Sequence, residues 1–335
     1  MTLNNFGGMF RERRFCRIAE MVPALAVAVM IFASPTAHAW GCQGHETVAL
    51  IAEMHMNPQT LAKVNQILKD SPPDASLNHY CKETGLTPMA EVASWADDYR
   101  SAHPETGGWH YIDIPRGGTR ADFAAACPEK EGCVTKALRT QVEILRAVSS
   151  TPQQRADALR FIIHFVGDIH QPLHDTTNND HGGNCVPVGF FGAEPQQRNP
   201  QSESYSPNLH GVWDSSIIGR MAGDKTVQQF AKEVEAAQAA RISGWMTGTT
   251  NFDDWAWEGH ELAESVTYGK LPHLIPVEKP VETPTCADDN HVAARNLALH
   301  EDLEQPYQDA AAPVVEQQLA KAGSRLAALL NDVLK

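Results

Sequence analysis

Beyond its first 39 residues the sequence lacks a run of apolar residues long enough to cross a membrane. A membrane-spanning helix needs about 20 such residues. The longest run, Met21 to Ala33, is shorter than this and lies near the N-terminus. We therefore expect no membrane association and a soluble mature chain.

Basic residues are also few. Residues 1–39 hold four Arg and two Glu, so 23 basic and 39 acidic residues remain in 40–335. This balance argues against a protein that binds duplex DNA through a broad basic face, because such binding depends on Lys and Arg contacts to phosphates. A phosphate substrate stays possible, since bound divalent cations would make an acidic cleft locally positive.

Cysteine never occurs as C-x-x-C, which weighs against a zinc–cysteine site, the competing interpretation of these residues. An even number of Cys in an exported chain predicts three disulfides, with 15 possible pairings. Spacing predicts only one pair, Cys127 with Cys133, which flank a short loop containing Pro and Gly. The six residues beyond position 39 are Cys42, Cys81, Cys127, Cys133, Cys185 and Cys286.

The N-terminal segment has the layout of an export signal. The apolar run is followed by Ala37-His38-Ala39, the small-x-small pattern cut by signal peptidase. A positive region precedes the run and contains Arg11, Arg13, Arg14 and Arg17. We expect a signal peptide over 1–39 and one mature domain over 40–335, in the periplasm or secreted.

Helical periodicity dominates the mature chain. Trp109 to Ile114 favours a short strand, 176–208 a long loop and 272–284 a Pro-rich crossing. Without a repeat or a second hydrophobic core, the pattern predicts an all-α, predominantly helical single domain with long loops. Helices are expected over 44–69, 87–101, 134–148, 209–220, 224–243, 253–268, 291–304 and 312–333, with a central helix from 152 that ends near 172.

One stretch, Phe161 to His174, combines a buried helix with metal-binding residue types. His164 and Asp168 are one helical turn apart, so both can reach one cation. Pro172 should end the helix nearby and let His174 leave its axis to serve a different metal ion. This arrangement favours a metal site over hydrogen-bonded core histidines.

The sequence holds 15 His, and several besides His164 and His174 have a partner at ligand spacing. His210 and Asp214 repeat the one-turn spacing. Nitrogen and oxygen ligands suit zinc, and their number suffices for more than one ion. His170 faces the other side of the helix and is assigned to the core or to a supporting role, while His181 is left open. The further candidates are His45, Asp97 and His110.

Six motifs occur in order along residues 40–214, and as a set they resemble the zinc-dependent single-strand nucleases of the nuclease S1/nuclease P1 type, which include mung bean nuclease. The C-terminal third is similar only as helical sequence. The motifs are Trp40-Gly-x-x-Gly-His45, Trp95-Ala-Asp97-x-x-Arg100, Trp109-His110-Tyr-Ile-Asp113, His164-Phe-x-Gly-Asp168-x-His-Gln-Pro-x-His174, Gly182-Gly-Asn184 and Leu209-His210-x-Val-Trp-Asp214.

The resemblance implies a helical fold of the phospholipase C/nuclease P1 type with three zinc ions at the base of a cleft. One ion would be held by Asp97, His110, His164 and Asp168. Asp168 would also reach a second ion, bound by His45 and by the backbone amine and carbonyl oxygen of Trp40. The third would be held by His174, His210 and Asp214.

The resemblance also implies the reaction. A hydroxide bridging two ions would attack the phosphodiester of single-stranded DNA or RNA, leaving 5′-phosphate products, and 3′-nucleotidase activity is expected too. Asp168 and Arg100 would be catalytic, Arg100 by contacting the phosphate. Tyr111 and Asp113 would bind the base, and Asn184 the substrate. No obligate protein partner is evident.

Two departures and two rival functions bear on this interpretation. Residues 185–208 are longer than expected after Gly-Gly-Asn, and the mature chain lacks an Asn-x-Ser/Thr sequon, which favours a bacterial exported enzyme. A zinc phospholipase C is one rival, disfavoured by the tight Trp40-to-His45 spacing and by Asp214, where a phospholipase would carry Glu. A non-catalytic periplasmic zinc-binding protein is the rival from another class.

Overall fold

The computed structural model describes residues 40–335, except 78, 83–84, 131, 274–284 and 288–290. The predicted signal peptide and most of the Pro-rich crossing lie outside the described residues. In the part of the chain that is described, no helix has the length and apolar character needed to cross a bilayer.

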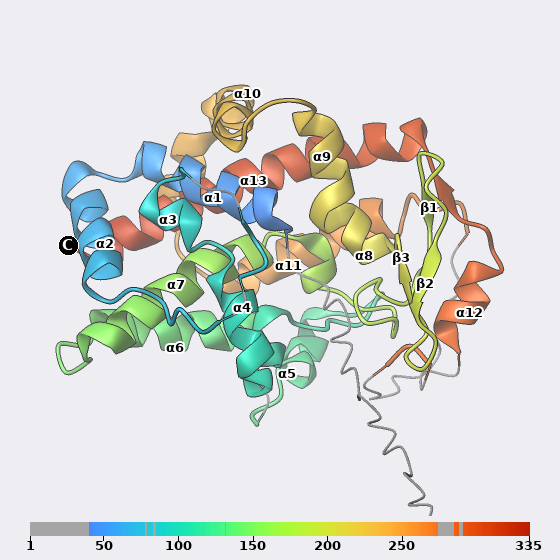
Figure 1. The fold of residues 1–335 in the computed structure, drawn as a ribbon, viewed down its shortest axis with the longest axis horizontal. Helices are drawn as coiled ribbons and strands as arrows, with labels where there is room; N and C mark the ends of the chain where they lie inside the picture. The colour runs from blue at the N-terminus through green and yellow to red at the C-terminus, as the bar shows by residue number, and fades with distance from the viewer. Residues whose placement is uncertain (1–39, 78, 83–84, 131, 274–284, 288–290) are drawn as a thin grey trace, which may run out of the picture. The chain divides into compact units, whose positions relative to one another are not determined.

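The fold is built on one long C-terminal helix, α13, with other helices packed along it (Figure 1). Helices α1, α7 and α10 contact α13, and α6 lies against α7. A single large hydrophobic cluster fills the space between them. The expected all-α class is confirmed. The α-helices are α1 (Cys42–His55), α2 (Pro58–Asp70), α3 (Pro88–Glu91), α4 (Trp95–Ala102), α5 (Phe123–Ala126), α6 (Val134–Arg146), α7 (Pro152–Asp168), α8 (Leu209–Gly211), α9 (Ile217–Ala222), α10 (Val227–Thr247), α11 (Phe252–Leu262), α12 (Val292–Leu297) and α13 (Gln305–Val333).

Shorter elements join these helices. Strands β1 and β4 pair in parallel, and β2 pairs antiparallel with β3. The 3₁₀-helices are η1 (Pro104–His110), η2 (Arg120–Asp122) and η3 (Pro172–His174), and the π-helices are η4 (Val212–Ser216) and η5 (Ala263–Thr267). The strands are β1 (Gly189–Phe190), β2 (Gln196–Asn199), β3 (Ser204–Ser206) and β4 (Asp302–Leu303).

Helix α7 begins and ends where its sequence predicts. The Thr151 hydroxyl accepts a hydrogen bond from the Gln154 backbone N–H at 3.2 Å, and the Gln154 side chain accepts one from the Thr151 N–H at 2.9 Å. This reciprocal pair, with Pro152 at the first helical position, satisfies N–H groups that a helix start leaves unpaired. The helix ends at Asp168, and Pro172 begins the short helix η3, which contains His174.

Two expected helices prove to be interrupted. The chain over 44–69 forms α1 and α2, because Asn57 caps a new helix at Pro58 by accepting a hydrogen bond from the Thr60 N–H at 2.8 Å. The chain over 87–101 forms α3 and α4 with a turn between them. In both places a local cap or turn overrides a continuous apolar pattern.

The expected strand over 109–114 is wrong. Trp109 and His110 end η1, and residues 111–114 lie outside any helix or strand and form only isolated backbone hydrogen bonds. The Ile112 N–H donates to the His174 carbonyl at 2.7 Å, and the Thr177 N–H donates to the Ile114 carbonyl at 3.0 Å. These bonds fix the segment after His110 beside the segment that follows α7.

The C-terminal elements and the long loop also differ in part from expectation. The 176–208 loop contains three short strands, and the helix expected over 291–304 shortens to α12. Helix α13 begins at Gln305, before the expected residue 312, and continues through Pro313.

Three disulfides join the six cysteines, and the predicted Cys127–Cys133 pair is among them. Three disulfides are typical of a protein exported to an oxidising compartment. Cys185 and Cys286 form the centre of a small second hydrophobic cluster that includes Val292 of α12. The other two pairs are Cys42–Cys81 and Cys185–Cys286.

Close packing of α1 on α13 depends on Gly323. A Cβ at this position would lie 2.6 Å from Ile51 Cβ and 3.0 Å from the Val48 carbonyl oxygen. We expect Gly323→Ala to lower the free energy of unfolding by about 1–3 kcal/mol, because the helices would have to separate. Denaturant unfolding measures this change.

Gly244 in α10 is the matched control, because a Cβ there meets no other atom within 4 Å. We expect Gly244→Ala to leave stability unchanged or raise it by up to about 1 kcal/mol, since Ala has the higher helix propensity. Equal effects at the two glycines would contradict close packing at Gly323.

Candidate metal centre

Buried His and Asp side chains converge in three groups, supplied by α1, α4, η1, α7, η3, α8 and η4. In each group, potential ligand atoms lie within 4.8 Å of one another. The groups are His45, His164 and Asp168; Asp97, His110 and His164; and His174, His210 and Asp214.

The Asp168 carboxylate joins the first two groups. Its Oδ1 lies 3.3 Å from His45 Nε2. Its Oδ2 lies 3.0 Å from His110 Nδ1 and 3.3 Å from His164 Nε2. Each oxygen therefore faces a different set of imidazoles, and all four side chains are buried. His45 also stacks on His164, with ring centroids 3.9 Å apart.

Asp97, from the first turn of α4, completes the second group. Its Oδ1 lies 3.8 Å from His110 Nδ1, and its Oδ2 lies 3.8 Å from His164 Nε2. The two imidazole nitrogens are 3.2 Å apart. Two carboxylates and two imidazoles thus surround one small space.

The third group combines two imidazoles with one carboxylate. His174 Nε2 lies 3.2 Å from His210 Nε2, and His210 Nε2 lies 3.3 Å from Asp214 Oδ2. Gln171 donates a hydrogen bond to the other oxygen, Asp214 Oδ1, at 2.6 Å. Oδ2 of Asp214 is thereby left to face the histidines.

Backbone carbonyls orient three of these imidazoles. His164 Nδ1 donates to the Ala93 carbonyl at 2.8 Å, His174 Nδ1 to the His110 carbonyl at 2.8 Å, and His210 Nδ1 to the Gly182 carbonyl at 2.6 Å. With Nδ1 protonated, Nε2 presents a lone pair to the centre of each group. Metal-binding histidines are commonly held in this way.

The residues fit metal ions. His45 Nε2 and Asp168 Oδ1, which face each other, are buried and make no hydrogen bond to any described residue. Buried polar atoms without partners are costly, so a ligand that binds them would offset that cost. Paired imidazole nitrogens 3.2 Å apart, beside carboxylates, match the nitrogen and oxygen ligands that zinc takes.

The protonation states of His110, His210 and Asp168 suit a metal, whereas burial raises the pKa of Asp214 well above its usual value. Burial lowers the pKa of His110 to about 4 and that of His210 to about 3, which keeps both rings neutral. Burial opposes ionisation of Asp168, but His164 and the hydrogen bond from His110 outweigh it and hold the Asp168 pKa below its usual value. Neutral imidazole and ionised carboxylate are the forms that bind metal.

His164 is the exception among the rings. Burial disfavours its charged form, but the Asp168 and Asp97 carboxylates outweigh burial and raise its pKa to about 9. Without a cation in the centre, the proton on His164 balances part of the negative charge. A bound metal ion would displace that proton.

Trp40 lies beside these groups at the start of the described chain. Its side chain is fully buried, and the N–H of the next residue, Gly41, donates to the Asp214 carbonyl at 2.7 Å. A Cβ on Gly167 would lie 2.6 Å from His45 Nδ1 and 3.7 Å from Trp40 Cδ1. Trp40 and His45 therefore both pack where α7 ends in Asp168.

The predicted substrate residues lie in segments that carry or adjoin the ligand groups. Arg100 Nη2 lies 3.0 Å from Asp97 Oδ1, and Tyr111, directly after His110, is 41% exposed.

Asp113 is half-buried; burial raises its pKa to about 6, which His181 opposes and Asp180 favours. Asn184 donates from its side-chain amide to the His181 carbonyl at 2.8 Å.

Gln171 and the three carbonyls were missed by sequence reasoning. Gln171 lies within the central motif, and its place between His170 and Pro172 was the available signal. The backbone carbonyls carry no sequence signal, because any residue type supplies the same atom.

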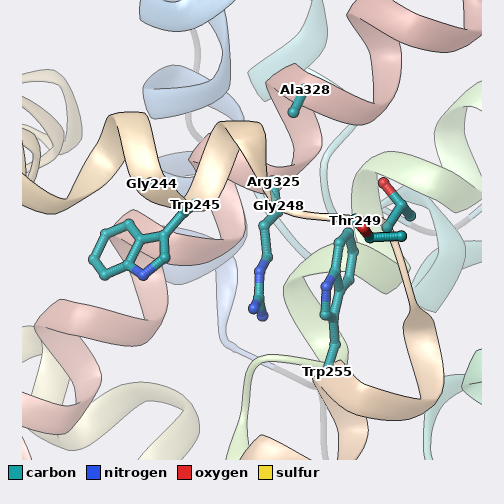
Figure 2. Close-up of a pocket in the computed structure, with 8 residues that line it drawn as sticks. Gly244, Trp245, Gly248, Thr249, Trp255, Arg325 and Ala328 are labelled. Carbon is teal, nitrogen blue, oxygen red and sulfur yellow. The ribbon is translucent and has the colours of Figure 1, made fainter.

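His170 stays outside the three groups. Its Nδ1 donates to the Val166 carbonyl at 2.8 Å, and its Nε2 lies 3.0 Å from Arg325 Nη1. Figure 2 shows Arg325 beside the indole of Trp255 in a pocket between α10, α11 and α13. No candidate metal ligand lines this pocket. Through its contacts with Val166 and Arg325, His170 links the end of α7 to α13.

Comparison with known proteins is consistent with this geometry. The family model of the S1/P1 nucleases matches residues 40–335. The chain is 30% identical to nuclease S1 of Aspergillus oryzae over 92% of its length and 96% of that protein. It is 28% identical to nuclease P1 of Penicillium citrinum, over 88% and 97%, and 27% identical to endonuclease 2 of Arabidopsis thaliana, over 94% and 97%.

Proposed function

The chain belongs to the S1/P1 nuclease family, whose members cleave single-stranded nucleic acids, and we propose that it does so with three zinc ions. We propose as its reaction the hydrolysis of DNA and RNA strands to products with 5′ phosphates, with 3′-nucleotidase activity in addition. It is a phosphodiester-hydrolysing enzyme, and it contains His and Asp groups that can bind the metal ions of such a reaction.

One observation carries the proposal: the two oxygens of the Asp168 carboxylate face different histidines. One oxygen faces His45, and the other faces His110 and His164, so a single buried charge serves two neighbouring positions. A carboxylate in this arrangement lets two cations lie close together, because its negative charge lies between them. Paired metal ions are the common solution for in-line attack on phosphate.

We assign the ligands as follows. Asp97, His110, His164 and Asp168 hold one zinc ion. The second is held by Asp168, His45 and the amine and carbonyl oxygen of Trp40. The third is held by His174, His210 and Asp214. Bound zinc supplies Lewis acidity, which polarises a phosphate oxygen and lowers the pKa of water toward neutrality.

The protein's own residues bind and orient the strand. The positively charged guanidinium of Arg100 lies next to Asp97 and contacts a phosphate oxygen through two N–H groups. Tyr111 presents an exposed ring against which an unpaired base stacks. Asp113 accepts hydrogen bonds from the base edge, and Asn184 contacts the substrate from the loop that follows η3. Bases within a duplex are already stacked, so single strands bind better.

Processing belongs to the same proposal. Residues 1–39 act as a signal peptide cleaved after Ala39, and residues 40–335 form the nuclease domain in the periplasm or outside the cell. Cleavage would free the amine of Trp40, whose side chain offers only an N–H donor and no metal ligand. The three disulfides support export.

The rival functions are not favoured. Zinc phospholipase C shares the helical His-x-x-x-Asp pattern, but the family match over 40–335 is to nucleases. A non-catalytic zinc-binding protein would not require Arg100 and Tyr111 beside the ligand groups.

The Asp168 bridge is tested by Asp168→Asn. The amide keeps the size of the side chain but removes its charge, so we expect two cations to repel each other and nuclease activity to fall by orders of magnitude. Hydrolysis of denatured DNA by the purified mature protein measures the effect, with zinc content determined on the same samples. Short-chain phosphatidylcholine is the rival substrate and should not be cleaved.

Asp157→Asn is the matched control, because it makes the same change in the same helix at a partly exposed carboxylate that pairs with Arg160. This variant should keep its zinc and its activity, whatever it loses in stability. Near-normal turnover by Asp168→Asn would refute the bridging role of Asp168.

The Trp40 assignment is tested by one added residue. An N-terminal Met placed before Trp40 converts the amine into an amide, a poor ligand, and crowds a buried position. We expect this variant to stay folded while it loses one zinc ion and nearly all nuclease activity. A chain that begins at Trp40 through signal cleavage is the control. Three bound ions and mature activity in the Met-extended chain would contradict the assignment.

A further inference from the structure

A tyrosine far from the ligand motifs reaches the loop that orients His210. Tyr268 directly follows η5, and its ring is buried. Its hydroxyl donates a hydrogen bond to Asp180 Oδ1 at 2.9 Å. Burial, followed by the neighbouring Asp180 charge, raises the pKa of Tyr268 well above its usual value, so the hydroxyl keeps its proton and remains a donor.

Asp180 closes a tight loop with the same oxygen. Oδ1 also accepts from the Gly183 N–H at 2.9 Å and from the Asn178 N–H at 3.3 Å. The Asp180 backbone carbonyl accepts from the Cys185 N–H at 3.0 Å. Burial raises the pKa of Asp180, and these donors oppose that rise. Asp180 therefore fastens the loop from 178 to 185, with its side chain at Asn178 and Gly183 and with its backbone carbonyl at Cys185.

The loop needs such fastening because its backbone is unusual. Asn179, His181, Gly182 and Gly183 have positive φ values of 57°, 54°, 58° and 81°. Left-handed conformations are costly for residues other than glycine and persist only where the surroundings impose them.

Gly182 lies at the point of closest approach. A Cβ there would lie 2.5 Å from the Leu173 carbonyl oxygen, so the backbone packs directly on the segment before His174. In this position the Gly182 carbonyl accepts the hydrogen bond from His210 Nδ1 at 2.6 Å. The direction of His210 Nε2 thus depends on the shape of the loop.

We infer that Tyr268 and Asp180 are positioning residues for the metal site formed by His174, His210 and Asp214. The pair holds the loop so that the Gly182 carbonyl fixes the His210 ring, and His210 Nε2 then faces His174 and Asp214. This inference rests on the proposed function, because it assigns a role toward the third zinc ion. Asn184 belongs to the same loop, so the pair also holds a proposed substrate residue in place.

Tyr268→Phe removes the hydroxyl alone and is the direct test. Outer hydrogen-bond partners of metal ligands typically contribute about 10–100-fold to metal affinity. We expect the third zinc ion to bind about 10–100-fold more weakly, with the other two ions retained. Chelator competition on the purified mature protein measures the three affinities, and Asp180→Ala should weaken the same ion.

Tyr307→Phe is the matched control. Tyr307 is also buried, and its hydroxyl donates to the Thr267 carbonyl at 2.7 Å and accepts from Trp213 Nε1 at 2.9 Å. Its loss removes two buried hydrogen bonds, to residues that precede Tyr268 and Asp214 in sequence, and leaves the 178–185 loop untouched, so it tests the effect of lost buried hydrogen bonds alone. This variant should bind the third ion as the wild type does.

A metal-independent measurement separates this inference from the proposed function. In the zinc-free wild type, the Nδ1–H of His210 should give a slowly exchanging NMR signal, and Tyr268→Phe should lose that protection. Unchanged protection and unchanged zinc affinity in Tyr268→Phe would overturn the inference, as would equal weakening in Tyr307→Phe. A wild type that binds no ion at His210 would overturn the zinc assignment, while loss of protection would still support the positioning role.

Discussion

The structure depends on a carboxylate that is buried among imidazoles. Asp168 has no exposed surface, yet its two oxygens lie within 3.3 Å of ring nitrogens from α1, η1 and α7. A buried charge is tolerated only where opposite charge or strong donors compensate it. The three imidazoles cannot all be protonated here, so cations between ring and carboxylate are the compensation that this donor set favours.

The surrounding fold serves to hold these groups at fixed distances. Helix α7 is capped at Thr151 and ends at Asp168, so the carboxylate lies where the helix stops. Backbone carbonyls then set the ring orientations, and the loop fastened by Asp180 and Tyr268 sets the carbonyl for His210. Side chains from distant parts of the sequence therefore meet with their ligand atoms already aligned.

Sequence reasoning succeeded where spacing carries geometry. The one-turn spacing of His164 and Asp168 and the exit of the chain at Pro172 follow from helix geometry, as does the overall helical class. It failed where a local cap competes with a continuous apolar pattern, as at Asn57. It could not find the Cys42–Cys81 and Cys185–Cys286 pairs or the bond from Tyr268 to Asp180, because those contacts depend on tertiary folding and leave no periodic signal.

The most direct test is a crystal structure of the mature protein with diffraction measured on both sides of the zinc absorption edge. The account predicts three anomalous peaks that are present above the edge and absent below it. Two of them should flank Asp168, one toward His45 and Trp40 and one toward Asp97, His110 and His164; the third should lie between His174, His210 and Asp214. A single peak at Asp168, or an Asp168 oxygen that binds no ion, would contradict the account.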